Sequence, residues 1–159
     1  MAPRSAGILL YRRDPDGLRL LLVHPGGPFW RGKDDGAWMI PKGMVEPDEE
    51  PLAAALREFE EELGAKPEGT PRALCTVRQA GGKWVEAFAL EGDFDLAALK
   101  SNEFTIEYPP KSGNFRAFPE VDEARWFTLA EARAKILKSQ APILEALEAL
   151  VVPGSTRDP

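Results

Sequence analysis

An amphipathic segment in the first half of the chain constrains the fold more than any other feature. Its apolar side chains recur at i, i+4, i+7 and i+11, which are Leu52, Leu56, Phe59 and Leu63. Such a stripe predicts an α-helix with one face buried against the rest of the protein. Asp48 is the expected N-cap, Pro51 is tolerated in the first turn, and Gly64 is placed to end the helix.

Short apolar, β-prone runs lie on both sides of this helix. The expected strands are Ser5–Tyr11, Leu18–His24, Ala73–Arg78, Trp84–Leu90, a weaker run at Phe104–Tyr108, and Ala124–Phe127. Gly81-Gly82-Lys83 lacks the rest of a P-loop and is expected to be a hairpin turn, while Pro109–Arg116 is expected to be a loop.

Two further helices are expected near the end of the chain. Thr128 and Glu131 have the spacing of a capping box, which would open a helix reaching about Lys138. A second helix is expected over Pro142–Val151. Strands before and after a central helix, with helices at the end, predict a single α/β domain with a mixed sheet. We expect this domain to span residues 1–152, with residues 153–159 as a flexible tail.

Composition excludes several classes of function. The chain has 159 residues, a net charge of -6 and a pI near 5.0, so it lacks the basic surface that nucleic-acid polymers or anionic membranes attract. With one cysteine, Cys75, and one histidine, His24, neither a disulfide nor a Cys/His zinc site can form within the chain. Arg12 and Arg13 interrupt the first apolar run, so no signal-peptide pattern is expected, and a reducing cytoplasm fits best.

Three carboxylates share one side of the central helix. Glu58, Glu61 and Glu62 fall within an arc of roughly 100° on a helical wheel, facing away from the apolar stripe. At about 6 Å and an effective dielectric of about 20, each pair repels by about 3 kcal/mol. On charge alone, a solvated acidic face explains this pattern. A bound divalent cation would also explain it, because magnesium takes carboxylate oxygens as ligands.

The wider pattern of residues 43–65 discriminates between these explanations. Seven positions have fixed identities at fixed spacing, namely Gly43, Glu49, Arg57, Glu58, Glu61, Glu62 and Gly64. They resemble the complete signature of the Nudix hydrolase family, G-x5-E-x7-R-E-U-x-E-E-x-G-U, where U is a bulky apolar residue. Ala65 is small for the last position, which affects packing more than chemistry. The flanking strands extend the likeness loosely over most of the chain.

The resemblance implies an α/β/α sandwich whose loop–helix–loop holds metal beside a substrate diphosphate. Glu61 and Glu62 would be the main ligands of Mg²⁺, for which Mn²⁺ can substitute. Glu58 would be a ligand or the general base, and the Gly43 carbonyl would add a further ligand. Glu49 would brace the loop or bind metal through water.

Two more residues acquire roles through the resemblance. Arg57 would orient the glutamates by charge-assisted hydrogen bonds rather than touch substrate. Many family members also carry a catalytic carboxylate in the loop before the last strand, and Glu120 is the best match here, with Glu123 second. A solvated loop glutamate is the alternative for both.

Cations near the signature are candidates for phosphate binding. Lys42 directly precedes Gly43, and further cations lie on two long loops, namely Arg31, Lys33, Lys111 and Arg116. Three aromatic residues could stack on a base, although aromatic residues are more often part of the core: Trp30, Trp84 and Phe115.

The reaction implied is metal-dependent hydrolysis of a phosphoanhydride bond in a nucleoside diphosphate-linked small molecule. The Pro41-Lys42-Gly43 segment resembles the dinucleoside polyphosphate and diphosphoinositol polyphosphate branches of the family. Downstream, Ala80 stands where many ADP-ribose hydrolases have proline, and Gly82 and Lys83 where many dinucleoside polyphosphate hydrolases have tyrosine.

We therefore expect a dinucleoside polyphosphate or a nucleoside triphosphate as substrate. A diphosphoinositol polyphosphate and an ADP-sugar are the alternatives within the family. A non-catalytic Nudix-like module that senses a nucleotide is a further alternative, although such modules usually lose glutamates of the signature and none is lost here. A purely structural acidic domain would leave the spacing as coincidence.

Overall fold

Two long strands at the start of the chain form the centre of a mixed sheet. The computed structural model describes residues 4–151. Strand β1 (Arg4–Asp14) turns at residues 15–16 into the antiparallel strand β2 (Gly17–Pro25), as the two apolar runs predict. Most of their side chains are buried, because both faces of the sheet are covered.

The remaining strands of this sheet come from distant parts of the chain. The strand order is β4-β5-β1-β2-β8, and β3 pairs with the first part of β1. Within residues 4–151, the β1–β5 pair is parallel and the other strand pairs of this sheet are antiparallel, so the sheet is mixed as predicted. The bounds are β3 Lys42–Met44, β4 Arg72–Arg78, β5 Trp84–Glu91 and β8 Val121–Thr128.

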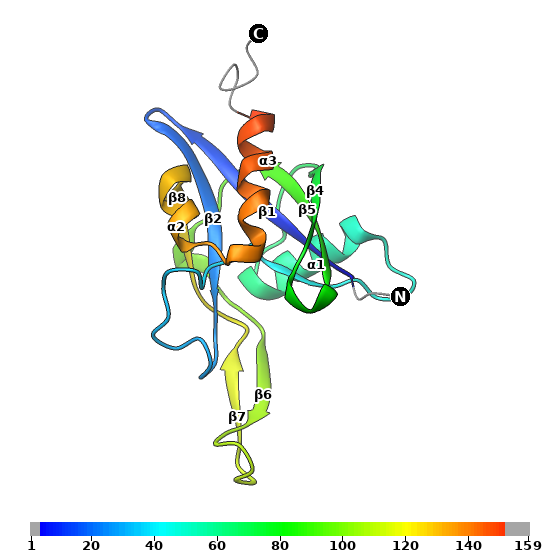
Figure 1. Ribbon diagram of the computed structural model, residues 1–159, viewed down its shortest axis with the longest axis vertical. Coiled ribbons are helices and arrows are strands. Elements are labelled where there is room, and N and C mark those ends of the chain that lie inside the picture. Colours follow the sequence, from blue (N-terminus) through cyan, green and yellow to red (C-terminus); the bar gives the residue numbers. More distant parts are fainter. Residues whose placement is uncertain (1–3, 152–159) are drawn as a thin grey trace.

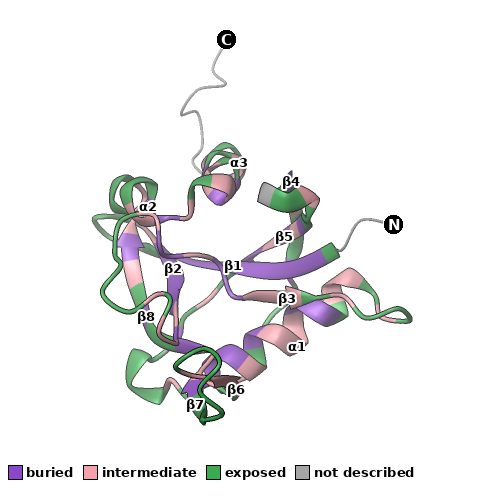
Figure 2. Ribbon diagram, turned by 60° about the horizontal axis from the view of Figure 1, so that its bottom comes forward, coloured by how far each residue is buried: buried purple, intermediate pink, exposed green. Residues whose placement is uncertain are grey.

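Helices cover both faces of the sheet (Figure 2). Helix α1 (Pro51–Leu63) packs through Phe59 and Leu63 against one face. On the other face lie α2 (Leu129–Lys135) and α3 (Ala141–Val151). Their buried side chains pack with those of the strands in a second apolar cluster. The predicted capping box of Thr128 and Glu131 is present, although α2 ends at Lys135 rather than near Lys138. The arrangement is the predicted α/β/α sandwich.

Helix α1 differs in two respects from its sequence-based prediction. Its N-cap is Glu50 rather than Asp48, with no side-chain capping bond, because Pro51 already occupies the first turn. Gly64 ends the helix as predicted, in the left-handed conformation at φ 86°. The buried side is rotated relative to the predicted stripe: Leu52 and Leu56 are only half-buried, while Ala54, Ala55 and Glu62 are buried. Small alanines let the helix lie close to the sheet there.

A two-stranded arm extends from the sandwich at the bottom of Figure 1. It consists of β6 (Glu103–Glu107) and β7 (Phe115–Pro119), which pair only with each other in the described chain. The prediction of a loop over Pro109–Arg116 is therefore wrong at its end, because Phe115 and Arg116 belong to β7. Phe104 packs near Phe118 across the two strands and gives the arm an apolar face.

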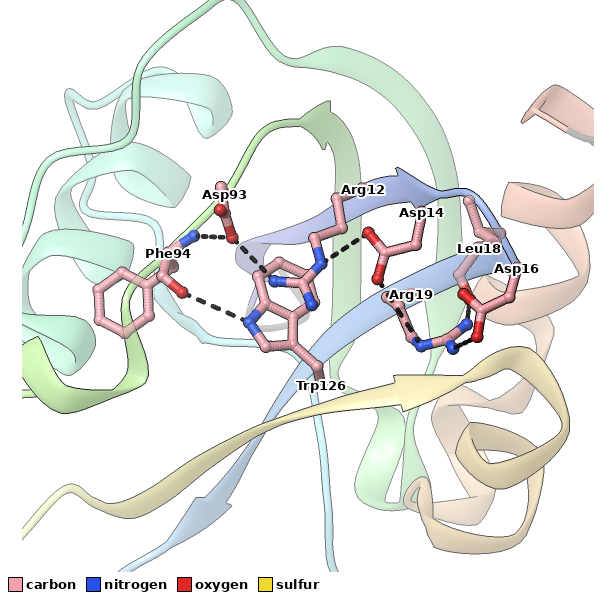
Figure 3. Close-up of polar contacts among 8 residues, drawn as sticks. All are labelled: Arg12, Asp14, Asp16, Leu18, Arg19, Asp93, Phe94 and Trp126. Atoms are coloured by element: carbon pink, nitrogen blue, oxygen red, sulfur yellow. Dashed lines mark hydrogen bonds and ion pairs between the residues drawn. The ribbon is translucent and has the colours of Figure 1, made fainter.

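Figure 3 shows that Arg12 lies between Asp14, Asp93 and the ring of Trp126. Arg12 on β1 donates to Asp14 and to Asp93, each at 3.0 Å, and its guanidinium lies 4.3 Å from the ring centroid of Trp126 on β8. The indole N–H of Trp126 in turn donates to the Phe94 carbonyl at 3.4 Å. These contacts fix the segment after β5 against β1 and β8. Among the described helices, none is long and apolar enough to span a bilayer.

Candidate metal centre and active site

Three partly buried carboxylates from two distant segments meet beside α1. Glu58, Glu61 and Glu120 each offer an oxygen within 4.8 Å of the other two. Glu120 stands between β7 and β8, where the sequence predicted a catalytic carboxylate. Glu123, the second candidate, is instead paired with Arg125 at 2.8 Å on the surface.

A series of backbone hydrogen bonds places Glu120 next to α1. The N–H of Asn102 donates to the Glu61 carbonyl at 2.8 Å, and the N–H of Glu120 donates to the Asn102 carbonyl at 2.8 Å. The N–H of Gly26 then donates to the Glu120 carbonyl at 3.0 Å. A Cβ on Gly26 would stand 2.0 Å from the Pro119 carbonyl oxygen, so this approach requires glycine. We call these bonds the Asn102–Glu120 ladder. Asn102 carries no sequence signal for this role, because it acts through its backbone.

Gly43 leaves the space that the Glu58 carboxylate occupies. A Cβ at Gly43 would lie 1.9 Å from Cδ of Glu58 and 2.2 Å from its Oε1. The first glycine of the signature is therefore needed because a carboxylate fills the space where its side chain would be. The pairing of Gly43 with Ala6 on β1 holds the strand at this distance.

Arg57 connects the glutamates, as the resemblance implied. Its Nε and Nη2 donate to the two oxygens of Glu49 at 2.8 and 2.9 Å, a bidentate pair. Its Nη1 donates to Glu58 at 2.8 Å and to Glu61 at 3.2 Å, and Nη2 also reaches the Met44 carbonyl at 3.0 Å. The Arg57 guanidinium, with the N–H of Glu46, lowers the pKa of Glu49 to about 2. Arg57 thus ties the loop before α1 to the carboxylates on the helix.

Glu62 lies behind this cluster, between α1 and β3. It is only 9% exposed, and burial, followed by the charges of Glu58 and Glu120, raises its pKa to about 9. Lys42 offers its backbone N–H and a partly compensating charge. Burial lowers the pKa of Lys42, against the opposing effect of Glu62 and Glu58. The expectation that Glu62 faces away from the buried stripe is thus wrong, and Glu62 is not in the group of three carboxylates that meet.

The cluster fits a hard divalent cation by its donor set. Burial and the neighbouring carboxylates raise the pKa of both Glu58 and Glu120, although Arg57 opposes the shift at Glu58. Within residues 4–151, the buried Oε2 atom of Glu120 has no hydrogen-bond partner. A buried acceptor without a donor is costly. A cation held by the three carboxylates would supply the missing partner and remove their repulsion.

The other predicted substrate residues are not part of this group of three carboxylates. Lys42 is adjacent to Glu62. Arg31 and Lys33 are exposed on the loop after β2, where the Lys33 ammonium lies 5.6 Å from the Trp30 ring centroid. Trp84 begins β5 beneath the guanidinium of Arg78.

The last two predicted cations are on the arm. Lys111 is at its tip, and Arg116 lies on β7 over the rings of Tyr108 and Phe118. Phe115 is 68% exposed on β7. His24 has a structural role, since its ring nitrogens contact the Asp122 carboxylate at 2.9 Å and the Lys33 carbonyl at 2.7 Å.

Comparisons with known proteins indicate the same family as the signature of residues 43–65. The family model described as the NUDIX domain matches residues 1–147. The RNA pyrophosphohydrolase of Rhodospirillum rubrum is 30% identical over 159 aligned residues, which cover 92% of this chain and 90% of that protein. Alignments with several other bacterial RNA pyrophosphohydrolases cover between 30% and 68% of their lengths.

Solved structures share the fold at lower sequence identity. An Ap4A hydrolase of C. elegans superposes with a TM-score of 0.66 at 21% identity, covering 95% of this chain and 98% of that one. The NUDIX domain of Shewanella oneidensis NrtR, in complex with ADP ribose, gives 0.66 at 20% identity, covering 94% and 88%.

The chain belongs to the Nudix family. It is a Nudix pyrophosphohydrolase, an enzyme that hydrolyses phosphoanhydride bonds.

Proposed function

We propose that the protein is a Mg²⁺-dependent hydrolase of nucleoside polyphosphates, with a dinucleoside polyphosphate or a nucleoside triphosphate as substrate. The observation that carries the proposal is the meeting of Glu58, Glu61 and Glu120 within 4.8 Å of one another. Such a cluster suits a cation that also binds phosphate oxygens, as magnesium does in nucleotide enzymes. When bound, magnesium neutralises phosphate charge and lowers the pKa of water.

The residues of the cluster would then have two roles, metal binding and proton transfer. Glu58, Glu61 and Glu120 would hold the cation, with Glu62 and the Gly43 carbonyl as the further ligands that the family signature implies. Glu58 or Glu120 would accept the proton of the attacking water, since both have raised pKa values and lie at the cluster.

Positively charged side chains would bind the phosphates. Lys42 lies closest to the cluster, next to Glu62, so its ammonium would contact a phosphate beside the metal. The cations of the two flanking segments would bind phosphates further along the substrate, and they are Arg31, Lys33, Lys111 and Arg116. This supply of cations favours substrates with more than two linked phosphates, because each phosphate adds a charge to neutralise.

The 5′-triphosphate end of an RNA is the second candidate substrate. The name of the R. rubrum relative favours it, while the net charge of -6 opposes tight binding of a long polyanion. ADP-sugars and diphosphoinositol polyphosphates remain alternatives, as does a module that binds a nucleotide without cleaving it.

A phosphate-release panel tests the proposal. Purified protein is assayed with Mg²⁺, Mn²⁺ or EDTA on Ap4A, ATP, ADP-ribose, a diphosphoinositol polyphosphate and a 5′-triphosphorylated RNA. We expect metal-dependent turnover, with the highest kcat/KM on Ap4A or ATP, and loss of turnover in Glu58→Gln and Glu61→Gln. Preference for the RNA or for ADP-ribose would overturn the substrate assignment. Metal-independent turnover would overturn the role of the carboxylates.

A further inference from the structure

A cavity of about 280 Å³ lies between the loop after β2 and the two-stranded arm. Its walls are mainly apolar and aromatic, and they are Pro28, Phe29, Ile106, Glu107, Tyr108 and Pro110. Phe29 is 76% exposed, which leaves a large apolar ring in water at the rim. Sites for whole small ligands measure about 300–1,000 Å³, so this cavity has the size for one part of a ligand.

The walls on the arm are held in place without a ligand. The Glu107 carboxylate accepts the N–H groups of Lys111 at 3.2 Å and Gly113 at 2.9 Å, which closes the tip of the arm. The N–H of Tyr108 donates to the Asn114 carbonyl at 2.8 Å. The Tyr108 ring packs edge-on against the buried Phe118, with centroids 6.2 Å apart. A ligand that stacks on Tyr108 therefore meets an aromatic ring already in position.

The loop that carries Phe29 is fixed to the same arm. A Cβ on Gly27 would lie 2.9 Å from the Phe104 ring, so the loop runs directly over the apolar face of the arm. Just before it, Gly26 is bonded to Glu120 by the Asn102–Glu120 ladder. The loop that forms one side of the cavity is thus bonded to Glu120 of the metal cluster, and the arm that forms the other side ends next to Glu120.

The cavity is within reach of a substrate bound at the cluster. Ile106, the wall residue nearest the cluster, is paired with Arg116, four positions along the chain from Glu120, and Tyr108 is bonded to Asn114, six positions from Glu120. At about 3.3 Å per residue, these separations are roughly 13 and 20 Å. A nucleotide whose phosphates bind at Glu58, Glu61 and Glu120 would extend away from the cluster over these distances to place its base.

We infer that this cavity binds the nucleobase of the substrate, between the rings of Phe29 and Tyr108. The inference rests on the proposed function, since it takes the phosphates of the same nucleotide to lie at the carboxylates. Recognition is by stacking, because the one carboxylate in the wall, Glu107, is already bonded to the backbone of the arm. Stacking tolerates any base, so the enzyme accepts adenine and guanine nucleotides alike.

Binding and kinetics of alanine variants test the site. The probe is an ATP analogue whose anhydride oxygens are both replaced by methylene groups, titrated with Mg²⁺ by calorimetry. Phe29→Ala and Tyr108→Ala should each raise its Kd roughly tenfold, as expected for loss of a base–aromatic stack. They should raise KM on the best substrate of the panel by a similar factor, with kcat unchanged. Tyr108→Phe, which keeps the ring, should restore wild-type affinity.

Phe115→Ala is the matched control, because Phe115 is an exposed aromatic residue of the arm that does not line the cavity. Alanine variants that change Kd no more than Phe115→Ala would overturn the base site. So would a loss confined to kcat, which would mean that the rings act on the metal cluster through the arm. If the wild type binds the analogue through Phe29 and Tyr108 but cleaves no nucleotide, the proposed reaction fails and the base site stands.

Discussion

Gly43 and Glu58 share a space that only one side chain can fill. Because a Cβ on Gly43 would come within 1.9 Å of the Glu58 carboxylate carbon, any larger residue must displace either β3 or Glu58. The displaced carboxylate would leave the cluster with Glu61 and Glu120. A single methyl group is thus enough to separate the three carboxylates.

Gly43→Ala should therefore abolish most of the turnover while the protein stays folded. We expect kcat to fall at least tenfold, the effect typical of disturbing a metal site through its supporting residues. Gly92→Ala is a suitable control, since its Cβ would meet only Leu10 at 3.3 Å. Steady-state kinetics and circular dichroism of both variants provide the measurement. Normal turnover in Gly43→Ala would contradict the assigned role of the glycine.

Arg57→Lys tests geometry rather than charge. Lysine keeps the positive charge but cannot donate to Glu49 with two parallel N–H groups while also bonding Glu58 and Glu61. We expect kcat to fall about 10- to 100-fold, because carboxylates held by this arginine lose their orientation. Arg125→Lys, in the surface pair with Glu123, should leave kcat unchanged. Equal effects of the two substitutions would mean that the Arg57 fork has no special function.

At the scale of elements, one buried glutamine joins segments that no strand pairing connects. Gln140 is fully buried between α2 and α3. Its Oε1 accepts the N–H of Ile40 at 3.0 Å, just before β3, and its Nε2 donates to the Gln79 side chain at 3.2 Å, just after β4. Gln140 therefore positions the segment that leads into Lys42 and Gly43.

Gln140→Leu should lower the free energy of unfolding by about 1–3 kcal/mol, because the N–H of Ile40 would be buried without an acceptor. Urea unfolding followed by tryptophan fluorescence measures this change. Ser139→Ala, at the neighbouring half-buried position, should change the free energy of unfolding by less than about 0.5 kcal/mol. A Gln140→Leu protein as stable as the wild type would show that water replaces the glutamine.

The elements themselves were largely predictable from local pattern. The β1–β2 hairpin, α1 and the capped α2 follow from alternation, helical periodicity and turn residues. Strand β7 was missed because its residues follow a Pro- and Gly-containing tip and end in Pro119, and it gains its partner only through β6. The burial of the Glu62 side chain was also missed. The buried alanines of α1 determine which side of the helix faces the sheet, and the pattern of large apolar residues does not reveal them.

The site was predictable only where a motif fixes spacing. Glu58 and Glu61 share a helix, so their proximity follows from its geometry. Glu120 lies far from them along the sequence and was chosen by family likeness alone. The Asn102–Glu120 ladder that brings it in consists of backbone groups, which every sequence contains. Phe29 and Tyr108 gave no signal, because a cavity between two loops has no periodicity.

At the scale of the whole molecule, the carboxylate cluster links metal binding to stability. Three like charges held together destabilise the folded chain, and a cation that binds only this arrangement stabilises it. Millimolar Mg²⁺ should therefore raise the Tm of the wild type by several degrees. Glu58→Gln/Glu61→Gln should melt at a higher temperature than the wild type without metal, and should gain much less from Mg²⁺.

Glu50→Gln/Glu60→Gln provides a control with the same change in charge, at exposed positions at the start and on the outer side of α1. Differential scanning fluorimetry with and without Mg²⁺ compares the three proteins. The control should gain as much from Mg²⁺ as the wild type does. If both double variants respond to Mg²⁺ as the wild type does, the three carboxylates are only a solvated surface.

The arm is tied to the sandwich at its base, and this has an evolutionary consequence. Asn102 and Glu120 hold the two ends of the arm beside α1, whereas the tip around Lys111 lies at the far end of β6 and β7. Residues inserted or deleted at the tip would alter the outer wall of the cavity without shifting Glu120, because surface loops tolerate changes in length. The substrate specificity of this fold can thus change during evolution while the carboxylates of the metal cluster keep their positions.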